Sequence, residues 1–124
     1  MYKITKETLN VFLEYYHYFH DGIIEKVNYD IKNDQIELIF RLIFKGEIKL
    51  SLDGKTYLKN ETTIRLLFKK IVEINIKEIF SWDFIGNAFL KYLKLNNNEC
   101  ICFATNENNP DIYIVSEFLE YEEI

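Results

Sequence analysis

Turn-forming residues are scarce in this chain of 124 residues, which contains four glycines and one proline. So few of them leave little room for long loops, while a hydrophobic fraction of 48% excludes a disordered chain. The chain also lacks a run of about 18 apolar residues that would span a membrane, and its N-terminal residues lack the apolar core of a signal peptide. The sequence therefore predicts a cytoplasmic protein without a membrane segment, folded as a single domain over residues 1–124.

Cysteine is equally rare, because Cys100 and Cys102 are the only two in the chain. They stand two residues apart in a predicted strand, so their side chains share one face. A disulfide across this spacing would be strained, and no CxxC motif or second pair is present for zinc or redox chemistry. We expect two reduced thiols, at least one of them in the core.

Basic residues are absent from the last quarter of the chain. Residues 95–124 contain seven acidic residues and no lysine or arginine, whereas residues 1–94 have a net charge of +2. Arg41 and Arg65 are the only arginines, and the lysines are scattered among acids, so we expect no nucleic-acid partner. The acidic segment either attracts a cationic protein surface at low salt or only keeps the protein soluble.

No catalytic or cofactor motif is complete in the sequence. His17, His20 and Asp21 would share a face on a continuing helix and could ligate a metal, but no third histidine is present. A nucleophile elbow, a phosphate-binding glycine loop and a dinucleotide fingerprint are all missing. We therefore predict no enzymatic activity, no cofactor and no metal. The alternatives are a metal-dependent enzyme centred on these three residues, or a domain that binds a small ligand on the concave face of its sheet.

Hydrophobic periodicity changes from helical to alternating near residue 20. After Thr5, a candidate N-cap, residues 6–19 predict an amphipathic helix whose apolar positions are Leu9, Phe12, Leu13, Tyr16 and Phe19. Alternation then predicts strands over residues 23–31, 36–44, 48–52, 55–59, 99–105 and 112–120. Asp53-Gly54 predicts a tight type I′ turn between the third and fourth of these strands.

Two segments, residues 62–77 and 84–95, fit either a helix or a strand, and β-branched residues favour strands in the first of them. The predicted fold class is α+β. An N-terminal amphipathic helix packs on a mostly antiparallel, meander-like β-sheet of about six to eight strands.

Between the helix and the first strand we expect a structural junction made of Phe19, His20, Asp21 and Gly22. In it His20 or Asp21 would satisfy backbone groups left open where the helix ends. Tyrosines on the helix and acids near the end of the chain form the predicted protein-binding surface, which comprises Tyr15, Tyr18, Glu117, Glu120, Tyr121, Glu122 and Glu123.

The order of residues at the junction and after it is Phe19-His20-Asp21-Gly22, then Ile24 and Val27. With its helix and antiparallel strands, the chain resembles a group of small bacterial domains that open with a helix, a Phe-His-Asp junction and an antiparallel sheet. Some of that group are classed as immunity proteins of polymorphic toxin systems, and many others have no assigned role. The resemblance implies a protein that binds and neutralises a toxin, and it carries over no catalytic residues.

Together with the acidic last quarter, this resemblance favours a non-enzymatic protein-binding domain whose partner is a cationic toxin. In this hypothesis the acids mimic the polyanion that a nuclease toxin binds, and the tyrosines anchor the complex.

Overall fold

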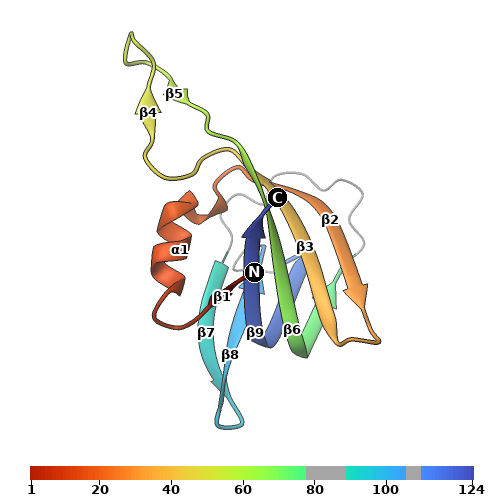
Figure 1. The fold of residues 1–124 in the computed structure, drawn as a ribbon. Helices are drawn as coiled ribbons and strands as arrows, with labels where there is room; N and C mark the ends of the chain where they lie inside the picture. The colour runs from red at the N-terminus through yellow and green to blue at the C-terminus, as the bar shows by residue number, and fades with distance from the viewer. Residues whose placement is uncertain (78–88, 106–109) are drawn as a thin grey trace.

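The structure is a computed structural model that describes residues 1–77, 89–105 and 110–124. Its elements in chain order are β1 (Tyr2–Ile4), α1 (Leu9–Tyr15), the 3-10 turn η1 (His17–Phe19), β2 (Ile23–Asp30), β3 (Gln35–Leu42), β4 (Lys49–Leu50), β5 (Tyr57–Leu58), β6 (Thr62–Ile76), β7 (Phe89–Leu95), β8 (Asn98–Ala104) and β9 (Ile112–Glu123). Within the described residues the protein is mostly antiparallel sheet with one short α-helix (Figure 1). The predicted combination of a helix and an antiparallel sheet is confirmed at that level.

Seven of the described strands form one sheet, in the order β2-β3-β6-β9-β8-β7, with β1 paired to β9. The sheet joins two antiparallel runs, β2-β3-β6 and β7-β8-β9, where the long strands β6 and β9 pair. It differs from a single meander, because the chain after β6 re-enters the sheet at the opposite edge as β7.

The two segments that fitted either helix or strand are strands wherever the structure describes them, although residues 84–88 lie outside the described residues. In β6 the alternating residues Ile64, Leu66 and Phe68 are fully buried, whereas Leu67 is only partly buried. Burial with a period of two is the signature of a strand with one face on the core.

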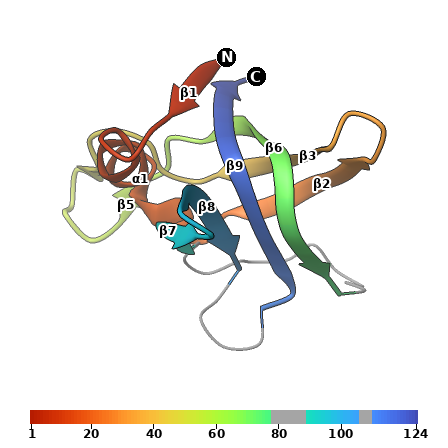
Figure 2. The same cartoon turned by 90° about the horizontal axis from the view of Figure 1, so that it is seen from below.

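The sheet is coiled strongly enough for strands three positions apart to meet across the core. Phe40 of β3 and Phe103 of β8 have ring centroids 5.8 Å apart, and Phe68 of β6 also contacts Phe103 at 5.8 Å. Pairing shifts in β2, between Ile24 and Lys26, and in β6 are bulges that increase twist, which Figure 2 shows between β2–β3 and β6–β9. The concave face is therefore filled by core side chains.

The N-terminal helix is shorter than predicted, because α1 ends at Tyr15. The next residues, His17, Tyr18 and Phe19, have φ values of 52°, 55° and 60°, which is a left-handed turn without glycine. The turn redirects the chain into β2 and places the fully buried Phe19 ring 5.2 Å from that of Phe40. Burial of this ring, worth about 1.5–3 kcal/mol, offsets part of the cost of left-handed backbone, which is about 1–2 kcal/mol per residue.

Strands β4 and β5 form a separate two-stranded sheet that projects from the body of the protein (Figure 1). We call residues 47–59 the arm. At its tip only Gly54 of the Asp53-Gly54 pair has a positive φ, of 71°, so the predicted type I′ turn is wrong. The turn is instead a longer loop, closed by a hydrogen bond from Ser51 N to Thr56 O of 2.8 Å.

Candidate binding site

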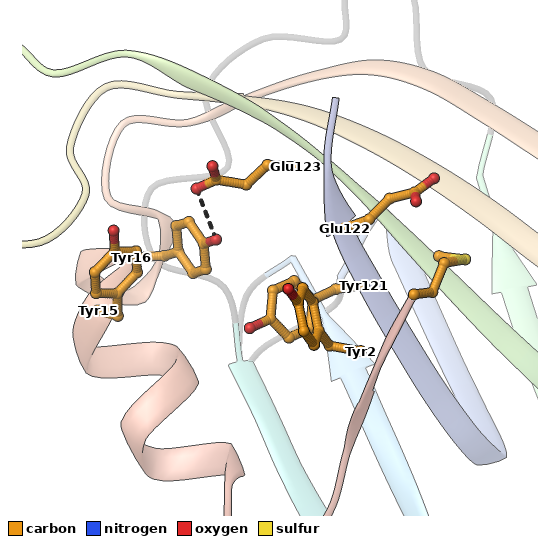
Figure 3. Close-up of a pocket in the computed structure, with 7 residues that line it drawn as sticks. Tyr2, Tyr15, Tyr16, Tyr121, Glu122 and Glu123 are labelled. Atoms are coloured by element: carbon orange, nitrogen blue, oxygen red, sulfur yellow. Dashed lines mark hydrogen bonds between the residues drawn. The ribbon is translucent and has the colours of Figure 1, made fainter.

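A groove rich in tyrosine lies between α1, β1 and the end of β9. It consists of two adjoining hollows of about 780 Å³ and about 450 Å³. We call it the tyrosine groove, and its lining residues are Met1, Tyr2, Lys3, Ile4, Thr8, Val11, Phe12, Tyr15, Tyr16, Tyr121, Glu122 and Glu123. Figure 3 shows the rings of Tyr2 from β1, of Tyr121 from β9, and of Tyr15 and Tyr16 from the C-terminal end of α1.

The pairing of β1 with β9 places Tyr2 directly opposite Tyr121, and their ring centroids are 5.5 Å apart. Tyr121 also contacts Phe12 of α1 at 4.6 Å, which joins the helix to the sheet at the floor of the groove. Tyr15 and Tyr16 approach from the end of α1, with their rings edge to face at 4.9 Å. Tyr2 and Tyr15 are exposed, so part of each ring is accessible to a ligand.

Tyr16 is the buried member of the set and donates a hydrogen bond of 2.9 Å from its hydroxyl to Glu123 Oε1. Burial and this bond to a carboxylate both raise the pKa of Tyr16 well above its usual range, burial having the larger effect. Lys45 Nζ lies 3.3 Å from the other Glu123 oxygen, Oε2. The carboxylate of Glu123 is thus fixed at the rim of the groove by two partners.

Of the predicted protein-binding residues, four lie together in this groove: Tyr15, Tyr121, Glu122 and Glu123. The Glu122 carboxylate is directed away from the rings (Figure 3) and pairs with Arg65. Tyr18 is exposed in the left-handed turn and does not line the groove.

The remaining predicted acids lie elsewhere on β9. Glu120 alternates with Tyr121, so it occupies the opposite face of the sheet, where it is 3.1 Å from Lys69 Nζ. Glu117 lies further along the strand, where its charge adds to the effect of burial in raising the pKa of the Cys100 thiol. Both cysteines are free and buried. The acids therefore do not form one continuous surface.

The junction residues serve packing and backbone geometry. Gly22 is required because an added Cβ would lie 2.9 Å from Leu42 Cδ2 and 2.9 Å from the Phe19 carbonyl oxygen. His20 Nε2 is 3.3 Å from Asp21 Oδ2, and both side chains are about half exposed. Asp21 itself has a φ of 56°, a left-handed conformation that Asp tolerates better than most residues.

His17 is separated from its two proposed metal-binding partners by the left-handed turn. Its Nε2 lies 2.6 Å from the carbonyl oxygen of Gly46, at the base of the arm. Among the described residues, no group of three or more His, Cys, Asp or Glu side chains is placed to hold a metal ion. None of the described helices is long and apolar enough to cross a membrane.

Two of the groove tyrosines, Tyr2 and Tyr16, are not predicted as binding residues from the sequence. Tyr16 has the same helical spacing as Leu9 and Phe12, which indicates a core position. Tyr2 belongs to a strand of three residues, which is too short to show alternation. The pairing of β1 with β9 brings Tyr2 to Tyr121, and the packing of α1 on the sheet brings Tyr16 within 6.1 Å of the same ring. No local sequence pattern encodes either contact.

Comparisons of the chain with protein families, curated proteins and solved structures found no match.

Proposed function

We propose that this protein is a non-enzymatic protein-binding domain that holds a lysine or arginine side chain of a cationic partner in the tyrosine groove. The observation that carries the proposal is the gathering of Tyr2, Tyr15, Tyr16 and Tyr121 around one hollow with the Glu123 carboxylate at its rim. Aromatic faces attract cations through the ring quadrupole, by about 0.5–1 kcal/mol at exposed sites. Tyrosine is also enriched among the residues that dominate binding energy in protein interfaces.

Charge supports a cationic rather than an anionic partner. The protein has a net charge of −5, and residues 95–124 carry none of the 15 basic residues. This field accelerates association with a basic protein and is screened by salt, because the Debye length is about 8 Å at physiological ionic strength. The groove then supplies the short-range contacts that the long-range field lacks.

The binding test uses an acetylated hexalysine peptide, titrated by calorimetry at low and physiological salt. Tyr2→Ala and Tyr15→Ala should each weaken binding about two- to fivefold, as expected for the loss of one exposed cation–π contact. Tyr29→Ala is the matched control, because Tyr29 is also exposed but lies on β2, outside the groove. Equal affinity in all three variants would mean that the peptide responds only to net charge, and the proposal would fail.

The partner that we propose is a cationic toxin, in line with the resemblance of Phe19-His20-Asp21-Gly22 to the junction of immunity proteins. In this proposal a secreted protein encoded beside this gene has a toxic C-terminal domain. Co-expression of this chain should restore growth of cells that produce that domain. The double variant Tyr2→Ala/Tyr15→Ala should lose protection while Tyr29→Ala retains it. Growth that the double variant restores as well as the wild type would argue against the groove as the toxin-binding site.

A further inference from the structure

The arm is the part of the described structure with the least support from the rest of the protein. β4 and β5 pair only through Lys49 with Leu58 and Leu50 with Tyr57. An isolated two-stranded hairpin is marginally stable in water unless another surface covers it. The base of the arm is nevertheless fixed, since Gly46 N donates a 2.7 Å hydrogen bond to Tyr15 O and Asn60 N donates one of 2.9 Å to Ile43 O.

Large apolar side chains are exposed along the whole arm, namely Ile48, Leu50, Leu52, Tyr57 and Leu58. Leu50 and Tyr57 lie directly opposite each other and so share one face, and Ile48 joins them by alternation. Leu52 at the tip is fully exposed to solvent. Exposed apolar side chains gathered in one segment in this way are typical of an interaction site.

The arm is also cationic. Residues 47–59 contain Lys49, Lys55 and Lys59 against the acids Glu47 and Asp53, which leaves a net charge of +1. The Asp53 carboxylate accepts hydrogen bonds from the Ser51 hydroxyl and from Lys55 N, which lower its pKa. The arm therefore presents apolar side chains interspersed with lysines, the chemistry that the tyrosine groove and its Glu123 carboxylate complement.

We propose that the arm of one copy of this protein occupies the tyrosine groove of a second copy, and that the contact is reciprocal. The arm leaves the body beside the groove, because Gly46 at its base lies against the Tyr15 ring. The same patch of each copy can then supply both an arm and a groove, as a two-fold interface requires. The arm has 13 residues and the groove 12, which together match the about 20–30 residues that each partner contributes to a stable interface.

This inference rests on the same groove as the proposed function, so the second copy and the cationic partner compete for one site. The dimer is then a reversible state in which the arm of the other copy occupies each groove. A partner with higher affinity for the groove releases the arm and converts the dimer into a one-to-one complex.

The test is sedimentation equilibrium of the wild type and three variants over a wide range of concentrations. The wild type should dimerise, and Leu50→Asp/Leu52→Asp and Tyr2→Ala should each weaken the dimer about tenfold or more. Ile31→Asp is the control, because Ile31 is as exposed but lies at the turn between β2 and β3. Circular dichroism checks that each variant is folded, and folding is expected because all the changed side chains are exposed.

A wild type that is monomeric at every concentration, or a dimer that Leu50→Asp/Leu52→Asp leaves intact, would overturn the inference. Hexalysine binding separates this failure from failure of the proposed function. If the protein is monomeric but Tyr2→Ala weakens hexalysine binding, the groove binds cations and only the arm exchange is wrong. If the dimer depends on Tyr2 and hexalysine does not bind, the arm exchange stands and the proposed function is wrong. If the arm exchange and the proposed function are both correct, Leu50→Asp/Leu52→Asp should bind hexalysine more tightly than the wild type, because no arm then occupies its groove.

Discussion

The hydrogen bond between Tyr16 and Glu123 connects the helix to the last strand, and its removal gives the sharpest test of the groove's architecture. Tyr16→Phe removes the hydroxyl and keeps the ring, which contacts Phe12 at 5.2 Å and Phe19 at 6.5 Å. Glu123→Ala removes the acceptor and leaves the buried Tyr16 hydroxyl without it. The two substitutions remove the same hydrogen bond from opposite ends. Tyr16→Phe leaves the Glu123 carboxylate without its donor, whereas Glu123→Ala leaves the Tyr16 hydroxyl without its acceptor.

The expected costs differ because the two groups differ in burial. A hydrogen bond to a charged group contributes about 1.5–3 kcal/mol. The Glu123 side chain is 39% exposed, so water can replace the hydroxyl in Tyr16→Phe, and we expect a cost at the lower end, about 1.5 kcal/mol. Glu123→Ala should cost about 2–3 kcal/mol, because a buried hydroxyl loses its acceptor and Lys45 loses its ion pair.

The assay is urea unfolding followed by circular dichroism for the wild type, both single variants and the double variant. The double variant should cost less than the sum of the single variants by about 1 kcal/mol or more, since one shared bond is counted twice in the sum. Tyr15→Phe is the matched control, because within the described residues no hydrogen bond to the Tyr15 hydroxyl is present, and we expect a change within about 0.5 kcal/mol. Additive effects would show that Tyr16 and Glu123 are not coupled, and the description of the groove's rim would be wrong.

Three further predictions concern the junction and the sheet. Gly22→Ala should lower the free energy of unfolding by about 1–3 kcal/mol, because the new Cβ meets Leu42 and the Phe19 carbonyl, and urea unfolding measures it. Asp21→Ala should cost about 1 kcal/mol through its left-handed φ, whereas Asp21→Gly should cost less, and equal costs would point to the carboxylate instead. Burial raises the pKa of Tyr113 to about 12, so its contribution to stability is complete below the unfolded pKa of about 10 and is lost as pH rises towards 12. Tyr113→Phe should therefore flatten the fall in stability between these pH values, and an unchanged pH profile would exclude the effect.

The strands were predictable where one face of the chain alternates cleanly with the other. Ile36, Leu38 and Phe40 share one face of the predicted strand, and β3 is found where this alternation predicts a strand. The strand order was not predictable, because the pairing of β6 with β9 depends on contacts between distant parts of the chain. The helix was predicted too long because Phe19 keeps helical spacing from Tyr16, although its ring reaches the core through a left-handed turn.

The candidate site was predictable in its chemistry and only partly in its geometry. Tyrosine beside acids indicated a binding surface, and Tyr15, Tyr121 and Glu123 do lie together. Alternation along β9 separates Glu120 from Tyr121, which the residue types alone did not reveal. The decisive partner, Tyr2, enters the site only through a strand pairing that joins the two ends of the described chain.

Two neighbouring residues of the left-handed turn, Tyr18 and Phe19, differ in how far burial offsets the energy of their backbone conformation. Tyr18 occupies a backbone conformation that glycine or asparagine would adopt at lower energy, yet nearly half of its side chain faces solvent. Phe19 is compensated for the same conformation by complete burial, whereas Tyr18 is compensated far less within the protein. Replacing Tyr18 by glycine is therefore expected to raise the free energy of unfolding, because glycine adopts this left-handed conformation without strain.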